Sequence, residues 1–368
     1  MDKGLRGITS FLNRGASDGT YPGAVLLVAH RGEEVLSHTV GNRTLIPEPL
    51  PLHHTTLFDL ASLTKPLATT LAVMKLMDDG KVDLDQPLPD LLLPASVPED
   101  KANVTLSALL SHCAGFENWR PFYLDPETEP RKNRKALVRE KILNTPLLYP
   151  PHTATLYSDL GFMVLEWVIE AQAGLSLPEY LRQRILGSLS LKHLFFYDVD
   201  ATSPFENDRF AATEECPWRK AVMTGVVQDE NAYFMGGYSG HAGLFGNIED
   251  VYALTNLLRE HHFGDRHDLF SPETVRAFFT RQDLVAGSTW ALGWDTPSRT
   301  ESSSGKYFSE ETVGHLGFTG TSIWMDLAKD VIVILLTNRI HPTRENEKIR
   351  QFRPLLHNRV MEALGLDK

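Results

Sequence analysis

The chain has 368 residues, of which 42% are hydrophobic and 23% are charged, a composition typical of a globular protein. Its net charge is -11, and the absence of a strong basic cluster argues against nucleic acid as a partner. No run approaches the roughly 18 apolar residues that a membrane span requires, so we expect no transmembrane segment.

The first segment, residues 1–19, predicts an amphipathic helix and not a signal peptide. Leu5, Ile8, Phe11 and Leu12 share one face, and the segment lacks the apolar core and small-residue cleavage site of a leader. We therefore expect a cytoplasmic protein, or a periplasmic or secreted one if a leader has been removed.

Strands are predicted near both ends of the chain. The apolar run 23–29 forms a hairpin with 34–39, and 321–326 pairs with 331–336. A final helix is expected over 344–364. This pattern indicates an α/β (α+β) fold in which both termini build one antiparallel sheet, flanked by helices.

The middle of the chain has the apolar periodicity of helices, interrupted by proline-rich loops. We therefore predict an α/β subdomain made of residues 1–65 and 232–368, and an inserted, mainly helical subdomain made of residues 66–231. The two would form one catalytic unit with its site at their junction, where pockets commonly form.

A nucleophile and an amine stand three positions apart at Ser62 and Lys65. Residues at i and i+3 share a helix face, and the apolar residues that follow predict a mostly buried helix whose first turn holds both groups. The positive field of a helix N-terminus favours the anions of acyl transfer. The same spacing recurs at Ser303 and Lys306, but that run is polar and predicts a solvated loop.

A serine nucleophile needs a base within hydrogen-bond reach, and the sequence offers two. Lys65 can act if burial or a nearby cation brings its pKa well below the ordinary value. Tyr157, which precedes an apolar helix at 163–169, can act as a phenolate beside that lysine. The two groups would titrate as a coupled pair, so either can be the proton acceptor.

A third segment, residues 315–320, lies directly before the third predicted strand. Gly317 would let a substrate approach the backbone at a strand edge. The N–H groups of Phe318 and Ser62 would form an oxyanion hole. His315 would supply a hydrogen bond or a positive charge near the base.

Together these segments resemble the beta-lactamase-related serine hydrolases, a superfamily that includes class C beta-lactamases, D-alanyl-D-alanine peptidases and family VIII esterases. The resemblance covers nearly the whole chain and rests on residues 58–66, 109–115, 157–161, 240–245 and 314–320. It implies that Ser62 is the nucleophile and that Lys65 and Tyr157 transfer protons. It also implies that the N–H of Phe318 is an oxyanion donor.

Two positions depart from the family pattern and bear on substrate binding. Asp159 stands where beta-lactamases usually have asparagine, and a carboxylate accepts hydrogen bonds without donating them. It could instead pair with Lys65, which would raise the pKa of that lysine and favour Tyr157 as the base. Leu316, in a His-Leu-Gly triplet that replaces Lys-Thr-Gly, has no hydroxyl for a substrate carboxylate.

We therefore expect a serine hydrolase that acts on small-molecule esters through a Ser62 acyl-enzyme, with weak or no beta-lactamase activity. The alternatives are a D-amino-acid peptidase, amidase or beta-lactamase of cell-wall metabolism, and a non-catalytic scaffold with the same fold. No cofactor is expected, and the 14 histidines and two cysteines show no metal-ligand spacing. Besides Asp159, Leu316 and Gly317, the candidates for pocket walls are residues 228–231, Trp119, Trp294 and Tyr233.

Overall fold

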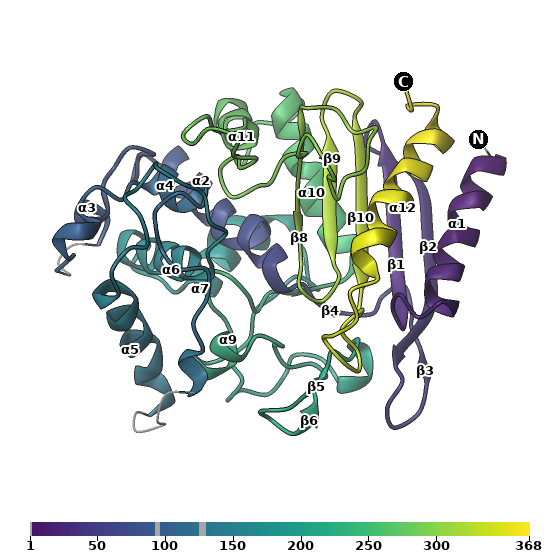
Figure 1. Cartoon of the computed structure of the whole chain (residues 1–368), viewed down its shortest axis with the longest axis horizontal. Coiled ribbons are helices and arrows are strands. Elements are labelled where there is room, and N and C mark those ends of the chain that lie inside the picture. The colour runs from purple at the N-terminus through teal and green to yellow at the C-terminus, as the bar shows by residue number, and fades with distance from the viewer. Residues whose placement is uncertain (1, 93–95, 125–129) are drawn as a thin grey trace.

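The computed structural model describes residues 2–92, 96–124 and 130–368. Strands from both ends of the chain build its main sheet: β1 (Gly23–His30), β2 (Glu33–Thr44), β3 (Leu50–Pro51), β8 (Thr312–Leu316), β9 (Ser322–Asp326) and β10 (Val331–Thr337). The sheet is antiparallel with the order β3-β2-β1-β10-β9-β8 (Figure 1). The predicted sheet from both termini is confirmed.

The side chains of β1 are buried on both faces of the sheet, which explains its uninterrupted apolar sequence. One face lies under α1 (Asp2–Ser17) and α12 (Ile349–Leu364), which run side by side in Figure 1. The other face joins the larger core, under α10 (Ile248–Phe263). The β1 residues of the first face are Ala24, Leu26 and Val28, and those of the second are Val25, Leu27 and Ala29.

The two terminal helices agree with the sequence prediction except at one boundary. In α1, Ile8 and Leu12 are buried against the sheet, and Leu5 and Phe11 pack beside them. Helix α12 begins at Ile349, later than predicted, because Arg344 lies in the preceding loop. There its guanidinium pairs with the carboxylates of Glu214 and Glu230.

The edge strand β8 was not predicted, because its last two residues were assigned to the 315–320 segment that precedes the predicted strand 321–326. Glycine disfavours strands, and Gly314 lies in the middle of this one. A Cβ atom at Gly314 would lie 2.3 Å from the indole ring of Trp324, so glycine is required by packing. His315 is therefore on a strand, opposite Ile323 of β9.

Between β3 and β8 the chain is largely helical up to Leu189 and then irregular. The first part contains α2 (Leu71–Asp78), α3 (Leu88–Leu91), α4 (Leu106–Leu110), α5 (Arg131–Asn144), α6 (Asp159–Ala173), α7 (Leu177–Leu181) and α8 (Gly187–Leu189). The second part contains α9 (Glu230–Phe234), α10 and α11 (Pro272–Phe279) among irregular segments. Four two-residue strands pair as β4 (Phe58–Asp59) with β7 (Phe245–Gly246) and β5 (Glu215–Cys216) with β6 (Ala221–Val222). One large hydrophobic core joins the helices to the sheet, and the predicted subdomain boundaries stay a prediction.

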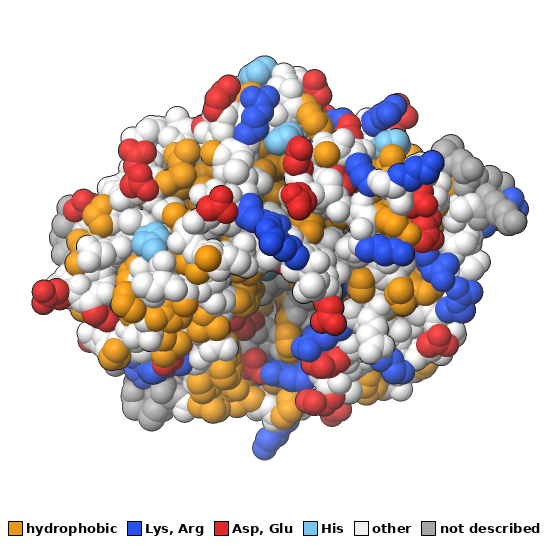
Figure 2. Space-filling model, turned by 45° about the horizontal axis from the view of Figure 1, so that its top comes forward, with side chains coloured by type: hydrophobic (Ala, Val, Ile, Leu, Met, Phe, Trp, Pro, Cys, Tyr) orange, Lys and Arg blue, Asp and Glu red, His pale blue; other side chains and the backbone are white. Residues whose placement is uncertain are grey.

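Within the described ranges, no single helix combines the length and hydropathy of a bilayer span. Helix α6 and the 177–189 helical segment pass that criterion only jointly, with a bend of 63° between them. On the face drawn in Figure 2, acidic and basic side chains are interspersed among hydrophobic ones, and a recess interrupts the surface.

Candidate active site

Ser62 and Lys65 lie on an irregular helical start. Ser62 is in a 3-10 turn (Ala61–Leu63), a π-helical segment follows (Lys65–Thr70), and α2 completes the helix. Pro66 supplies no backbone N–H to this first part, which accounts for a departure from regular α-helical bonding. The expected i, i+3 contact is nevertheless present, with Lys65 Nζ 3.1 Å from Ser62 Oγ.

Ala61, the residue before the nucleophile, has a left-handed backbone with φ of 47°, which is costly for a residue other than glycine. The buried carboxylate of Asp59 holds this turn. Its Oδ1 accepts from the N–H of Ala61 at 2.8 Å, and its Oδ2 accepts from the N–H of Gln228 at 2.6 Å. Burial raises the pKa of Asp59 to about 6, although these two hydrogen bonds lower it. No role was predicted for Asp59 from the sequence.

The Lys65 ammonium is fully buried and lies among three oxygen atoms. It donates to Ser62 Oγ at 3.1 Å, to Asp159 Oδ1 at 2.7 Å and to the carbonyl oxygen of His241 at 3.4 Å. Burial lowers the pKa of Lys65, but Asp159 and Tyr157 outweigh it, so the net shift is upward. The pairing of Lys65 with Asp159 considered from the sequence is present, and the lysine is charged.

Tyr157 lies over this ammonium, with its ring centre 4.7 Å from Lys65 Nζ. Burial raises the pKa of Tyr157, whereas the charge of Lys65 and hydrogen bonds with Lys65 and Ser62 oppose the shift. The ring packs against His112, at 4.7 Å, and Trp290, at 5.7 Å. The structure thus brings the hydroxyl, the amine and the phenol together.

His315 reaches the same place from β8 but carries no charge. Its Nδ1 lies 2.9 Å from the carbonyl oxygen of Leu316, so Nδ1 bears the proton and donates. Burial and the nearby Lys65 lower the pKa of His315 to about 3. Of the two roles expected from the sequence, the positive charge is therefore wrong, and a neutral hydrogen-bonding imidazole remains.

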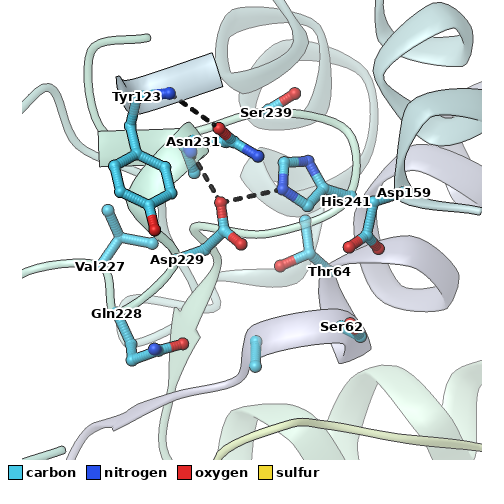
Figure 3. Close-up of polar contacts among 12 residues, drawn as sticks. Ser62, Thr64, Tyr123, Asp159, Val227, Gln228, Asp229, Asn231, Ser239 and His241 are labelled. Atoms are coloured by element: carbon cyan, nitrogen blue, oxygen red, sulfur yellow. Dashed lines mark hydrogen bonds and ion pairs between the residues drawn. The ribbon is translucent and has the colours of Figure 1, made fainter. Parts of the chain in front are cut away.

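A second basic residue beside Lys65 is His241, for which no role was predicted from the sequence. His241 Nε2 lies 3.0 Å from Asp229 Oδ1, and Figure 3 shows the two side chains facing each other. Burial lowers the pKa of His241, but Asp229 and Asp159 raise it, and the net shift is upward. Asp229 is placed by α9, because its side chain accepts from the N–H of Ala232 at 2.7 Å.

The Gly317–Phe318 turn packs directly against the segment that leads to Ser62. A Cβ atom at Gly317 would lie 2.0 Å from Thr321 Oγ1 and 2.7 Å from the carbonyl oxygen of Leu60. Glycine is thus required for packing within the protein, which differs from the substrate approach expected from the sequence. Arg339 Nε donates to the carbonyl oxygen of Phe318 at 3.0 Å and fixes the turn.

A cavity of about 800 Å³ opens over these groups. Most of the sequence-predicted site residues line it: Ser62, Trp119, Tyr157, Asp159, Gln228, Asp229, Glu230, His315, Leu316, Gly317 and Phe318. Lys65 is buried below Ser62, while Trp294 and Asn231 are buried residues outside the lining. Tyr233, also outside it, packs edge-on against Trp218.

One group of potential metal ligands is present in the described part of the chain. The ligand atoms of Glu214, Cys216 and Glu230 lie within 4.8 Å of one another. Arg344 pairs with both carboxylates, and Gln228 Nε2 donates to Glu214 Oε1 at 2.8 Å. The negative charge of this group is therefore partly neutralised by the guanidinium of Arg344.

The geometry of the site is that of a serine hydrolase, and comparisons agree with it. The family model described as Beta-lactamase matches residues 8–357. A relative from Salmonella agona (strain SL483), named "Putative D-alanyl-D-alanine carboxypeptidase", is 31% identical over 90% of this chain and 82% of its own. The chain belongs to the beta-lactamase family of serine hydrolases.

Solved structures agree on the fold. "EstCE1, a hydrolase with promiscuous acyltransferase activity" has a TM-score of 0.71 and 23% identity, over 96% of this chain and 99% of its own. The octameric penicillin-binding protein homologue from Pyrococcus abyssi has a TM-score of 0.72 and 19% identity, over 99% of this chain and 78% of its own. At this identity the likeness concerns the fold alone.

Proposed function

We propose that this protein is a carboxylesterase that cleaves small-molecule esters through an acyl-enzyme at Ser62. The observation that carries the proposal is the contact of Ser62 Oγ with Lys65 Nζ at 3.1 Å, under the ring of Tyr157. A serine hydroxyl becomes an effective nucleophile when an adjacent base takes its proton, and in this proposal the base is the phenolate of Tyr157 beside the charged Lys65.

In the proposed reaction, Ser62 Oγ attacks the ester carbonyl carbon while its proton passes to the phenolate oxygen of Tyr157. Lys65, kept charged by Asp159, stabilises that phenolate. The oxyanion binds the N–H groups of Ser62 and Phe318, each contributing about 3 kcal/mol in the transition state. The alcohol leaves with the proton of Tyr157, and water then hydrolyses the acyl-enzyme by the same route.

The side chains around the nucleophile favour esters over beta-lactams. Asp159 only accepts hydrogen bonds and is engaged with Lys65, Leu316 offers no hydroxyl, and His315 is neutral. Trp119 and Phe318, which are 40% and 42% exposed, give the cavity two aromatic walls suited to apolar groups of an ester.

The second candidate is a D-amino-acid peptidase. The name of the Salmonella relative favours it, and so do the four arginines that line the cavity, Arg339, Arg344, Arg350 and Arg353. A guanidinium binds a peptide C-terminal carboxylate through charge-assisted hydrogen bonds.

The test combines covalent labelling with a substrate panel. A fluorophosphonate probe should label Ser62, and the adduct should be absent in Ser62→Ala. Short-chain esters should turn over faster than D-alanyl-D-alanine peptides or a chromogenic cephalosporin. Faster peptide cleavage would favour the peptidase, and absence of labelling between about pH 6 and pH 10 would favour a non-catalytic scaffold.

A further inference from the structure

His112 contacts the backbone on both sides of Tyr157. The N–H of Leu156 donates to the carbonyl oxygen of His112 at 3.0 Å, and the N–H of Ser158 donates to His112 Nδ1 at 3.0 Å. His112, which lies 45 positions before Tyr157 in the chain, thus accepts hydrogen bonds from the backbone amides on both sides of Tyr157.

The imidazole of His112 also packs against the phenol. Its ring centre lies 4.7 Å from that of Tyr157 and 4.3 Å from that of Trp290, and only 2% of the residue is exposed. The backbone of His112 is left-handed, with φ of 57°. Few residues other than glycine adopt this conformation, although histidine does so more often than most, and it persists where the surrounding structure enforces it.

The tautomer of His112 follows from its hydrogen bonds. Because Nδ1 accepts from the N–H of Ser158, the ring proton is on Nε2, which has no partner within the described residues. Burial, with the charge of Lys65, keeps the pKa of His112 well below its ordinary value. The imidazole is therefore neutral and Nδ1 remains an acceptor.

We propose that His112 is a positioning residue, which fixes the phenol of Tyr157 against Ser62 and Lys65 through the Ser158 amide and the ring contact. This inference rests on the proposed function, because it concerns the delivery of a proton acceptor to Ser62. A displacement of the order of 1 Å at a reacting group can reduce the rate about 100-fold.

Two substitutions separate the hydrogen bond from the ring contact. His112→Phe keeps an aromatic ring but removes the acceptor, and we expect kcat for an ester to fall about 100-fold. His112→Asn supplies an oxygen acceptor and tolerates a left-handed backbone, so its kcat should exceed that of His112→Phe by about tenfold or more. Equal losses in the two variants would overturn the role of the hydrogen bond.

A double-mutant cycle tests whether His112 acts through Tyr157. In a Tyr157→Phe background, His112→Phe should change the rate of fluorophosphonate labelling by less than about twofold, because the group that it positions is absent. A further loss as large as in the wild-type background would overturn the proposal. If His112→Phe does not fold, the same cycle with His112→Asn and its smaller loss decides the question.

The matched control is His261→Phe, which removes another buried histidine, on α10, that packs edge-on against Phe270. It reports the general cost of losing a buried histidine, and a loss of kcat equal to that of His112→Phe would overturn the proposal.

The proposed function and the positioning role of His112 can be contradicted separately. Absence of Ser62 labelling in the wild type contradicts the hydrolase, whereas labelling that depends on Tyr157 but combines additively with His112→Phe contradicts only the positioning role.

Discussion

The buried ammonium of Lys65 and the partly exposed carboxylate of Asp159 form an ion pair, with Nζ 2.7 Å from Oδ1. The pair keeps Lys65 protonated, and burial raises the pKa of Tyr157. The resting site therefore holds both protons at neutral pH. In the proposed mechanism, one of them must leave before Ser62 can be activated.

The pH dependence of activity follows from this arrangement. The base form is populated as pH rises, so kcat/KM for an ester should increase with pH, by about tenfold per unit below the pKa of the coupled pair. Initial rates across neutral and alkaline pH would measure it, with a melting curve at each pH to exclude unfolding. A profile that falls between neutral and mildly alkaline pH would contradict a protonated resting pair.

Asp159→Asn should shift the rise of kcat/KM with pH to lower pH. The carboxylate contributes to the raised pKa of Lys65, so its removal lowers that pKa, and a shift of about one unit or more is expected for a close ion pair. The control is Asp330→Asn, which removes an ion pair with Arg259 at the β9–β10 turn. If kcat/KM of Asp159→Asn rises over the same pH range as that of the wild type, Lys65 does not contribute to the pH dependence.

Leu316→Thr should improve beta-lactam turnover relative to ester turnover. Leu316 lines the cavity at the end of β8, where a hydroxyl would be able to donate to a substrate carboxylate. One added hydrogen bond to a charged group corresponds to about tenfold or more in the ratio of kcat/KM values. Leu316→Val, which is also β-branched but lacks the hydroxyl, is the matched control. If Leu316→Thr leaves the ratio of beta-lactam to ester kcat/KM unchanged, the missing hydroxyl does not cause the weak anion recognition.

The parts of the fold and site that could be predicted depend on short-range patterns. The terminal strands follow from apolar runs, and the contact of Ser62 with Lys65 follows from i, i+3 spacing on a helical turn. Tyr157 was identified because its motif occurs in the order that the family shows. Each of these signals lies within a few consecutive residues.

What could not be predicted depends on contacts between distant segments. Strand β8 was missed because glycine is unfavourable in strands, and Gly314 is explained by its close contacts with the ring of Trp324 and the carbonyl oxygen of Ile323. The pKa of His241 is raised by Asp229, which lies 12 positions earlier in the chain, and the pKa of His315 is lowered by burial. The sequence alone does not indicate a raised pKa for a histidine in a glycine-rich run, such as His241, because its acidic partner is not known from the sequence.

Asp229→Asn should lower the pKa of His241. Asp229 is the main group that raises this pKa against burial, and its Oδ1 lies 3.0 Å from His241 Nε2. An asparagine oxygen can still accept the hydrogen bond, so the change is mainly in charge. NMR titration of the His241 ring protons in both proteins would measure it. A pKa equal to that of the wild type would mean that Asp229 does not stabilise the charge.

The carboxylate of Asp59 should make the stability of the fold depend on pH in an unusual direction. Its pKa is raised from 3.8 to about 6 in the folded protein. Between these values the folded state binds more protons than the unfolded state, so the free energy of unfolding decreases as pH rises through this window. The difference between these two pKa values corresponds to a decrease of about 3 kcal/mol in the free energy of unfolding by neutral pH.

Asp59→Asn removes the ionisation and keeps one oxygen acceptor for the N–H of Ala61 or of Gln228. We expect the variant to be less stable than the wild type at acidic pH, because one of these buried N–H groups loses its acceptor. The difference should shrink as pH rises towards neutral, since only the wild type must ionise a buried carboxyl. Urea unfolding of both proteins at several pH values would measure this difference, and subtraction of the two curves cancels the other titrating groups. Parallel curves would show that Asp59 ionises with an ordinary pKa in the folded protein.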